Sequence, residues 1–181
     1  MKHTLVALVE NKPGVLNRVT TLFRRRNFNI DSLTVGRTEN PFISRMTIVV
    51  DSDADPEQVR QQLYKLINVI QVEDVTHLPG VSRDLALIKV QVDSQTRSEV
   101  VQLCDIFRAR IVDVTPDSVI VELTGDEQKI SSMVELLRPI GILEMVRTGV
   151  VTMTRGEEVL AANNYAQRTG QPSNGHRATV I

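Results

Sequence analysis

The fold of this chain is decided by residues 5–16, which read LVALVENKPGVL. The apolar run at 5–9 predicts a buried strand, and apolar residues spaced three and four apart from Val15 to Phe23 predict an amphipathic helix. Between them, Pro13 presets φ for a turn or for the first turn of a helix. Gly14 has no Cβ, so another group can approach the backbone there. The stretch therefore predicts a strand, a tight turn and the start of a helix.

The start of this helix is also a candidate anion site. The N–H groups of Val15 and Leu16 have no partner within the helix and lie at the positive end of the helix dipole. Such an end favours a carboxylate or a phosphate. The residues leave one alternative open, which is that Asn11–Gly14 simply turns the chain into the helix.

Composition indicates an ordinary globular protein and argues against several classes of function. The 181 residues suffice for one or two domains, and 41% of them are hydrophobic and 24% are charged. A net charge of −1 gives no basic field to attract nucleic acid or an anionic membrane, and 3% aromatic residues are too few for stacking bases. No apolar run reaches the roughly 20 residues that span a bilayer. We therefore expect neither nucleic acid nor a membrane as a partner.

Cysteine usage and the N-terminus favour a cytoplasmic protein. Cys104 is the single cysteine, so no internal disulfide forms, and a reducing compartment suits such a chain. No signal peptide is visible before the first strand pattern. His3, His77 and His176 stand far apart without cysteine or carboxylate at ligand spacing, so no metal site is expected.

One pattern of elements occurs twice along the chain. In the first half, strands at 3–10, 30–36, 42–50 and 72–78 alternate with helices at 15–23 and 56–70. In the second half, strands are expected at 85–92, 110–114, 118–124 and 142–153, with one helix capped by Ser94 or Thr96 and another started by Gly125-Asp126. An irregularity is expected near Ser32 and an interruption near Gly149. Both halves have the order β-α-β-β-α-β, which is typical of the ferredoxin-like unit.

The expected fold is therefore α+β, with two ferredoxin-like βαββαβ domains at 1–79 and 83–157. The segment Pro79-Gly80-Val81-Ser82 separates them. From 158 to 181 the apolar periodicity is lost, apart from a short run at 161–165 that could extend as a helix. We predict that this tail is disordered.

The sequence contains no set of residues that predicts catalysis. There is no nucleophile elbow, no glycine-rich phosphate loop and no carboxylate pair beside a general base. Cys104 falls on the apolar face of a predicted helix, where a thiol is normally part of the core. The run Arg24–Arg26 could attract an anion or could simply be solvated. What remains is a binding function.

The residues around the first strand–helix corner suit a small amino acid. Asn11 and Asn29 supply amide donors and acceptors, and with the N–H groups after Gly14 they could hold an α-carboxylate and an α-ammonium. Ile30 and Val35 would suit a branched aliphatic side chain. We therefore expect a small pocket for an amino acid and not for a nucleotide.

Several segments resemble a known family. Residues 8–16, LVENKPGVL, followed by Arg18-Val19 and Leu22-Phe23, resemble the opening of an ACT domain. Residues 26–36, RNFNIDSLTVG, with SRMTI at 44–48, resemble the small regulatory subunit of acetohydroxyacid synthase, also called acetolactate synthase. FRARIVDV at 107–114 and RTGVV at 147–151, continuing to Arg155-Gly156, are similar to that family too.

The resemblance implies a protein without chemistry of its own. Such subunits bind a thiamine-diphosphate-dependent catalytic large subunit, raise its activity and make it sensitive to feedback by valine. The resemblance places thiamine diphosphate, Mg²⁺ and FAD in the catalytic partner and no cofactor in this chain. The longer hairpin loop Arg37–Phe42 is our expected contact with the large subunit.

The resemblance also implies a homodimer through the ACT domains, with valine at their interface. The matching residues of one copy are Asn11, Gly14, Val15 and Leu16, and those of the other copy are Asn29 and Ile30. The second domain has Asp93-Ser94-Gln95-Thr96 in place of this corner. We therefore expect no second amino-acid site there.

Overall fold

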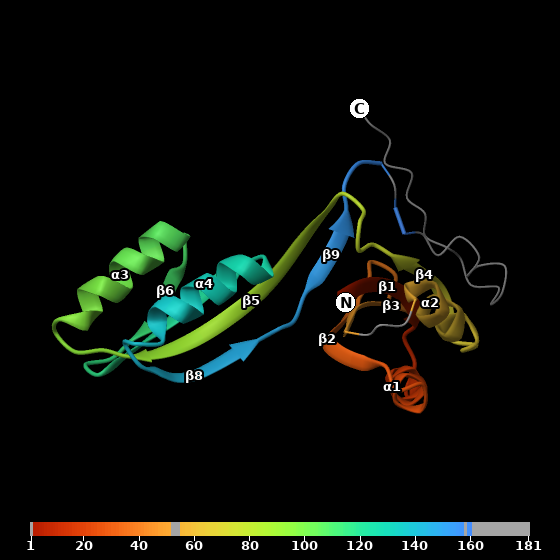
Figure 1. The fold of residues 1–181 in the computed structure, drawn as a ribbon, viewed down its shortest axis with the longest axis horizontal. Helices are drawn as coiled ribbons and strands as arrows, with labels where there is room; N and C mark the ends of the chain where they lie inside the picture. Colours follow the sequence, from red (N-terminus) through yellow and green to blue (C-terminus); the bar gives the residue numbers. More distant parts are fainter. Residues whose placement is uncertain (1, 52–54, 158, 161–181) are drawn as a thin grey trace. The chain divides into compact units, whose positions relative to one another are not determined.

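The computed structural model describes residues 2–51, 55–157 and 159–160, and it divides into two compact units (Figure 1). The first unit holds the described residues up to Gly80 and from Thr154 onward, and the second holds Val81–Met153. The sequence had set the domains at 1–79 and 83–157. The predicted disorder at 158–181 and the short helix at 161–165 lie outside the described residues, except for Val159 and Leu160.

The first unit is an antiparallel sheet with two helices. Its elements are β1 (Lys2–Glu10), α1 (Val15–Arg25), β2 (Asn29–Arg37), β3 (Ile43–Asp51), α2 (Pro56–Tyr64) and β4 (Val69–Asp74). The strands lie in the order β2-β3-β1-β4, so β2 is an edge strand. A register shift between Ile30 and Ser32 confirms the predicted irregularity in β2.

Both helices of this unit pack on one face of its sheet. The core combines apolar residues of β1, β3 and β4 with those of the helices: Leu5, Ala7, Val9, Val15, Val19, Phe23, Met46, Ile48, Val50, Val59, Leu63, Val69 and Val72. The Phe23 ring meets Phe28 edge to face, with centroids 6.0 Å apart and planes at 73°. This contact fixes the chain where it leaves α1 and enters β2.

The second helix is shorter than its apolar pattern predicted. It ends at Tyr64, and the bonds from Lys65 N–H to Gln62 O and from Leu66 N–H to Leu63 O tighten the chain into a turn. Ile67 is therefore 76% exposed, and Ile70 belongs to β4. The apolar residues keep a helical spacing beyond Tyr64, although the chain has by then turned back to form β4, which pairs with β1.

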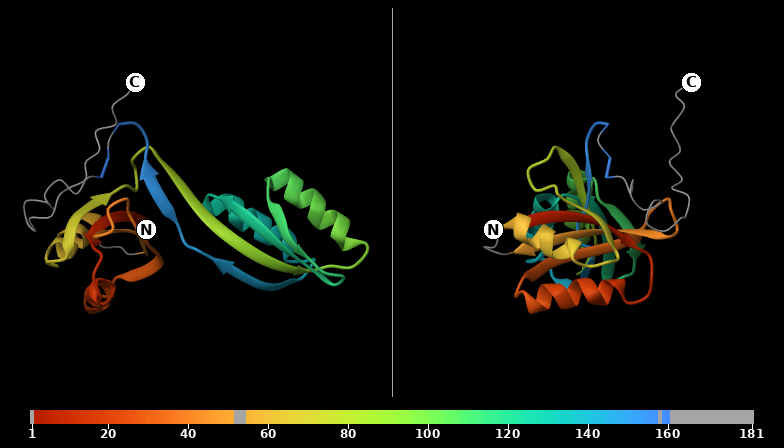
Figure 2. Two further views of the ribbon diagram at one scale, coloured as in Figure 1. Left: turned by 180° about the vertical axis from the view of Figure 1, so that it is seen from behind. Right: turned by 90° about the vertical axis from the view of Figure 1, so that its right-hand side faces the viewer.

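The second unit repeats the topology with one additional strand. Its elements are β5 (Gly80–Gln91), α3 (Thr96–Phe107), β6 (Arg110–Val114), β7 (Ser118–Gly125), α4 (Glu127–Leu137), β8 (Ile142–Arg147) and β9 (Val151–Thr154). The order is β6-β7-β5-β8, and β9 also pairs with β5. The two helices cover one face of this sheet (Figure 2). The fold class is thus α+β with two βαββαβ units, as predicted.

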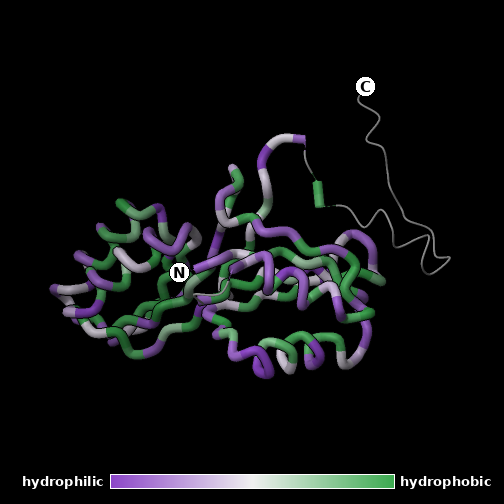
Figure 3. The backbone as a smooth tube through the Cα atoms, turned by 45° about the vertical axis from the view of Figure 1, so that its right-hand side comes forward, coloured by the Kyte–Doolittle hydropathy of each residue, from purple (hydrophilic) through white to green (hydrophobic). Residues whose placement is uncertain are grey.

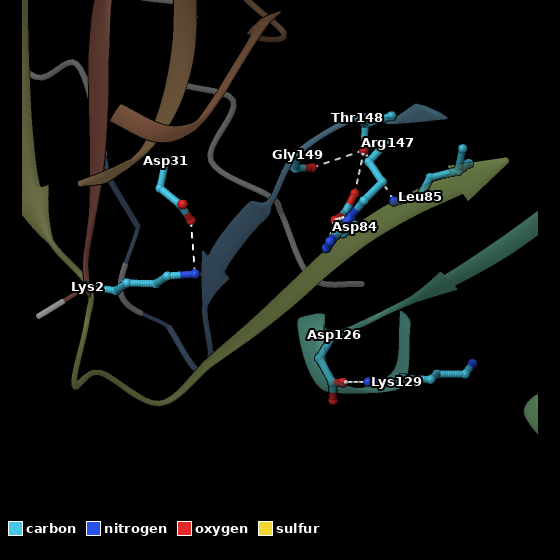
Figure 4. A network of polar contacts seen from close by, with 9 residues as sticks. All are labelled: Lys2, Asp31, Asp84, Leu85, Asp126, Lys129, Arg147, Thr148 and Gly149. Atoms are coloured by element: carbon cyan, nitrogen blue, oxygen red, sulfur yellow. Dashed lines mark hydrogen bonds and ion pairs between the residues drawn. The ribbon is translucent and has the colours of Figure 1, made fainter. Parts of the chain in front are cut away.

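The buried carboxylate of Asp84 bonds the residues at the interruption between β8 and β9. Gly149 has a φ of 88°, which confirms the predicted interruption of the last strand. Asp84 is 2% exposed and accepts hydrogen bonds from Arg147 Nε at 2.7 Å and from Thr148 Oγ1 at 3.1 Å (Figure 4). A second nitrogen of the Arg147 guanidinium also donates to Asp84. The carboxylate is therefore buried but fully partnered.

Within the residues described, no helix is long and apolar enough to cross a membrane. Hydrophilic and hydrophobic residues instead alternate along the helices (Figure 3). This alternation is the pattern of helices that bury one side and expose the other.

Candidate ligand site at the start of α1

The start of α1 presents backbone donors without a side-chain cap. Gly14 is the N-cap, with φ 83° and ψ −8°, a left-handed conformation that glycine adopts without strain. The sequence predicted that Val15 and Leu16 would carry unpaired N–H groups. Val15 N–H has a long bond to Lys12 O at 3.4 Å, whereas no acceptor among the described residues faces the N–H of Leu16 or Asn17. The open donors therefore lie one position further along than predicted.

The other three helices begin differently, because each has a carboxylate at its start. Asp55 accepts from Glu57 N–H at 2.9 Å, and Asp126 accepts from Lys129 N–H at 2.8 Å. At α3, Asp93 accepts from the N–H groups of Gln95 and Thr96, both at 2.8 Å. The predicted cap at Ser94 or Thr96 was therefore wrong, since neither side chain accepts from the first turn and Asp93 does.

The hydrogen bonds to Asp93 affect whether the start of α3 could bind an anion. Backbone and side-chain donation from Thr96, with backbone donation from Gln95, lowers the pKa of the Asp93 carboxyl below its ordinary value. The chain's own carboxylate thus occupies the corner that matches the start of α1. An incoming carboxylate would meet a like charge there.

Asn11 organises the hairpin loop beside the helix start. Its Nδ2 donates to Pro41 O at 2.8 Å, and its N–H donates to Phe42 O at 2.7 Å. One hydrogen of the side-chain amide is therefore used within the chain, and the side-chain oxygen is left as an acceptor. Sequence reasoning had not connected Pro41 and Phe42 with this corner. The residues Asn40-Pro41 could have indicated a tight turn in this loop. The side chains of Thr38 and Asn40 form that turn by accepting from the N–H groups of Asn40 and Phe42.

Val15 and Leu16 have different surroundings. Val15 is 5% exposed and belongs to the core, so only its backbone can contribute to a site. Leu16 is 45% exposed and projects an apolar side chain beside the open N–H groups. The corner thus combines donors for an anion with an apolar contact.

Asn29 and Ile30 lie at the beginning of β2, beside a different hollow. Together with Thr20, Phe23, Arg24, Asn27 and Phe28 they line a depression of about 460 Å³. Asn29 is exposed, and Ile30 is partly buried against the core of the first unit. Asn27, just beyond the end of α1, has a φ of 57°, a left-handed conformation that asparagine tolerates.

The two halves of the predicted site are at opposite ends of α1. The helix has 11 residues, which corresponds to about 16 Å at 1.5 Å per residue. A small amino acid cannot bridge that distance. A single copy of the chain therefore does not bring Gly14 and Asn29 together around one ligand.

Other chemistry is not seen in the described part of the chain. Among those residues, no three His, Cys, Asp or Glu side chains gather as metal ligands would. Cys104 is buried at 4% exposure in the core of the second unit, and burial, followed by the charge of Asp105, raises the pKa of its thiol. A core thiol held in its neutral form is a weak nucleophile.

Comparison with known proteins assigns both units to one family. Residues 5–71 match the family described as "AHAS small subunit-like ACT domain", and residues 83–156 match "Small subunit of acetolactate synthase". A "Probable acetolactate synthase small subunit" of Archaeoglobus fulgidus is 57% identical over 159 residues, which cover 87% of this chain and 99% of that protein. The "Acetolactate synthase small subunit" of Mycobacterium leprae is 52% identical over 155 residues, which cover 85% and 92%.

A solved structure is similar over the same region. The crystal structure of the acetolactate synthase small subunit from Thermotoga maritima matches with a TM-score of 0.81 at 42% identity. The match covers 87% of this chain and 99% of that one.

The first unit is therefore an ACT domain of the kind found in AHAS small subunits, and the second unit matches the small subunit of the same enzyme. The chain belongs to the acetolactate synthase small-subunit family. It is thus a regulatory subunit of that enzyme, and membership of this family implies a large-subunit partner.

Proposed function

We propose that this chain activates the catalytic large subunit of acetolactate synthase and makes it sensitive to feedback by valine in branched-chain amino-acid synthesis. The observation that carries the proposal is the uncapped start of α1, whose Leu16 and Asn17 N–H groups face no acceptor among the described residues. A helix start of this kind favours a carboxylate. Thiamine diphosphate, Mg²⁺ and FAD belong to the catalytic partner in this proposal, and the complex works in the cytoplasm.

The site is completed by a second copy of the chain, and the sheet topology supports this. β1 and β2 both run antiparallel to β3, so they are parallel to each other. Lys2 and Asn29 both pair with Asp51, whereas Glu10 pairs with Ile43 and Arg37 with Ser44. β1 and β2 therefore end on the same side of the sheet, where α1 begins. Asn29 starts β2 and lies at the opposite end of that strand.

Antiparallel pairing of two β2 edge strands would join the separated halves. Such pairing places the beginning of β2 of one copy beside the end of β2 of the other. Since α1 begins at that end, Asn29 and Ile30 of one copy would approach Gly14 and Leu16 of the other. The resulting dimer has two equivalent sites.

The chemistry of the joined site fits an aliphatic amino acid. The Leu16 and Asn17 N–H groups would bind the carboxylate, and the amide oxygens of Asn11 and Asn29 would accept from the ammonium. The exposed side chain of Leu16 and the partly buried Ile30 would contact the branched side chain. Valine shifts the enzyme toward a less active state only if it binds that state better.

The first test is acetolactate formation by the cognate large subunit, with and without this chain, across a valine titration. We expect the chain to raise the activity and valine to reverse the increase. If activity is unchanged but valine still raises the melting temperature, the chain senses an amino acid for another partner. Saturation at 100 times the dissociation constant would add about 2.7 kcal/mol to stability, which is measurable.

Asn29→Ala is expected to weaken valine binding without loss of the fold, because Asn29 is exposed and its amide would bond the ligand. The loss of one or two such hydrogen bonds should raise the dissociation constant about 5- to 30-fold. Calorimetric titration with valine measures it. Asn17→Ala, which keeps its backbone N–H, is the matched control and should bind valine nearly as wild type does. Unaltered affinity in Asn29→Ala would count against the shared site.

A further inference from the structure

A groove between α1 and α2 gathers positive charge on the first unit. It has a volume of about 480 Å³, and four cationic side chains line it: Arg18, Arg25, Arg26 and Lys65. Leu22 and Leu66, both partly buried against the core, form its apolar part. No aspartate or glutamate lines the groove.

The positive charge of the groove is local and is not neutralised within the described residues. The whole chain has a net charge of −1, yet α1 contains no acidic residue. Arg18 donates to the neutral Asn68 Oδ1 at 2.6 Å. No carboxylate among the described residues pairs with Arg25, Arg26 or Lys65, whereas Arg60 on the neighbouring surface pairs with Glu57 at 2.7 Å.

The helix dipole explains only part of this arrangement. Cations are favourable at the C-terminal end of a helix, where Arg25 and Lys65 stand. Arg18 lies near the beginning of α1, where the dipole disfavours a cation. Stabilisation of the helix therefore does not explain the position of Arg18.

We propose that this groove docks an acidic segment of the catalytic large subunit. The inference rests on the membership of the family, which supplies the partner, and adds the surface and its chemistry. Arg18 and Arg25 are seven positions apart on α1, about 10 Å along its axis, so the charge is spread over a length that suits a peptide segment. A single small phosphate would instead need the cationic side chains to converge on one point. Arginine is also enriched at protein interfaces.

The test is the affinity of the full-length double variant Arg25→Glu/Arg26→Glu for the cognate large subunit, measured by calorimetry at low and high salt. We expect the dissociation constant to rise at least about 30-fold at low salt and the salt dependence to become weaker. Arg25→Gln/Arg26→Gln should lie between this variant and wild type. Arg83→Glu/Arg138→Glu, which makes the same charge change at exposed residues of the second unit, should bind like wild type.

The outcomes separate this proposal from the proposed function. If wild type binds the large subunit and the groove variant binds equally well, the groove is not the docking surface. If tripolyphosphate binds wild type but not the variant, and the affinity for the large subunit is equal in both, the groove is a small-anion site and the proposal fails. If wild type itself does not bind the large subunit, the proposed function fails first. Valine binding by the groove variant should remain, and this reports an intact fold.

Discussion

Gly14→Asp is expected to abolish the response to valine while the first unit stays folded. The new carboxylate would lie at the N-cap of α1 and could accept from the N–H groups that the ligand carboxylate needs. It would also repel the ligand's charge. A Cβ at Gly14 meets no atom within 4 Å, so the substitution does not clash. We expect valine to bind at least about 30-fold more weakly, which corresponds to about 2 kcal/mol.

The backbone at Gly14 requires a matched control. Its φ of 83° is unfavourable for any side chain by about 1 kcal/mol, and Asn and Asp tolerate it best. Gly14→Asn has the shape of the aspartate and the same backbone strain but no charge. We expect it to keep a measurable response to valine in the enzyme assay. If both variants lose valine binding equally, backbone strain or occupation of the N–H groups is the cause and the charge argument is wrong. If Gly14→Asp keeps wild-type affinity, the ligand does not bind at this helix start.

The sequence was sufficient for the fold because local signals and the topology agree. The strand–turn–helix pattern around Gly14 and the repeat of six elements both point to one unit used twice. The interruption near Gly149 was visible because glycine stands between two apolar strand segments. The end of α2 was not predicted, since the spacing of Leu66 and Ile70 still fits a helix and only pairing with β1 assigns Ile70 to a strand.

The candidate site was less accessible to sequence reasoning than the fold. Residue type suggested Asn11 as a ligand donor, but its N–H and one hydrogen of its Nδ2 bond the hairpin loop. Residue type also could not distinguish Asp93, which bonds the start of α3 from outside the helix, from a serine or threonine cap. Both outcomes depend on where a short polar side chain finds its partner across a turn. The separation of Gly14 from Asn29 follows from the length of α1. Only the sheet topology shows how a second copy of the chain could bring the two residues together.

Arg147→Ala should strongly destabilise the second unit. Asp84 is 2% exposed, and the guanidinium is its charged partner (Figure 4). Removal of one partner of a buried pair leaves an uncompensated charge, which costs about 3–5 kcal/mol. Because the Arg147 side chain is 32% exposed, water can partly replace it, so we expect about 3 kcal/mol, the lower end of that range. A loss of this size lowers the melting temperature of a domain this small by about 12 °C or more.

Two measurements test whether the unpaired charge of Asp84 causes this loss of stability: where in the fold it occurs, and whether it disappears when the charge is removed. Amide hydrogen exchange should become faster in β5 and β8, which the pair joins, and stay unchanged in β1 and β3 of the first unit. The double variant Asp84→Asn/Arg147→Ala should be more stable than Arg147→Ala alone, because a neutral amide can remain buried with its bond from Thr148 Oγ1. If the double variant is less stable than the single one, the arginine acts through packing of its side chain. If Arg147→Ala melts like wild type, water already solvates Asp84 and the pair does not stabilise the break between β8 and β9.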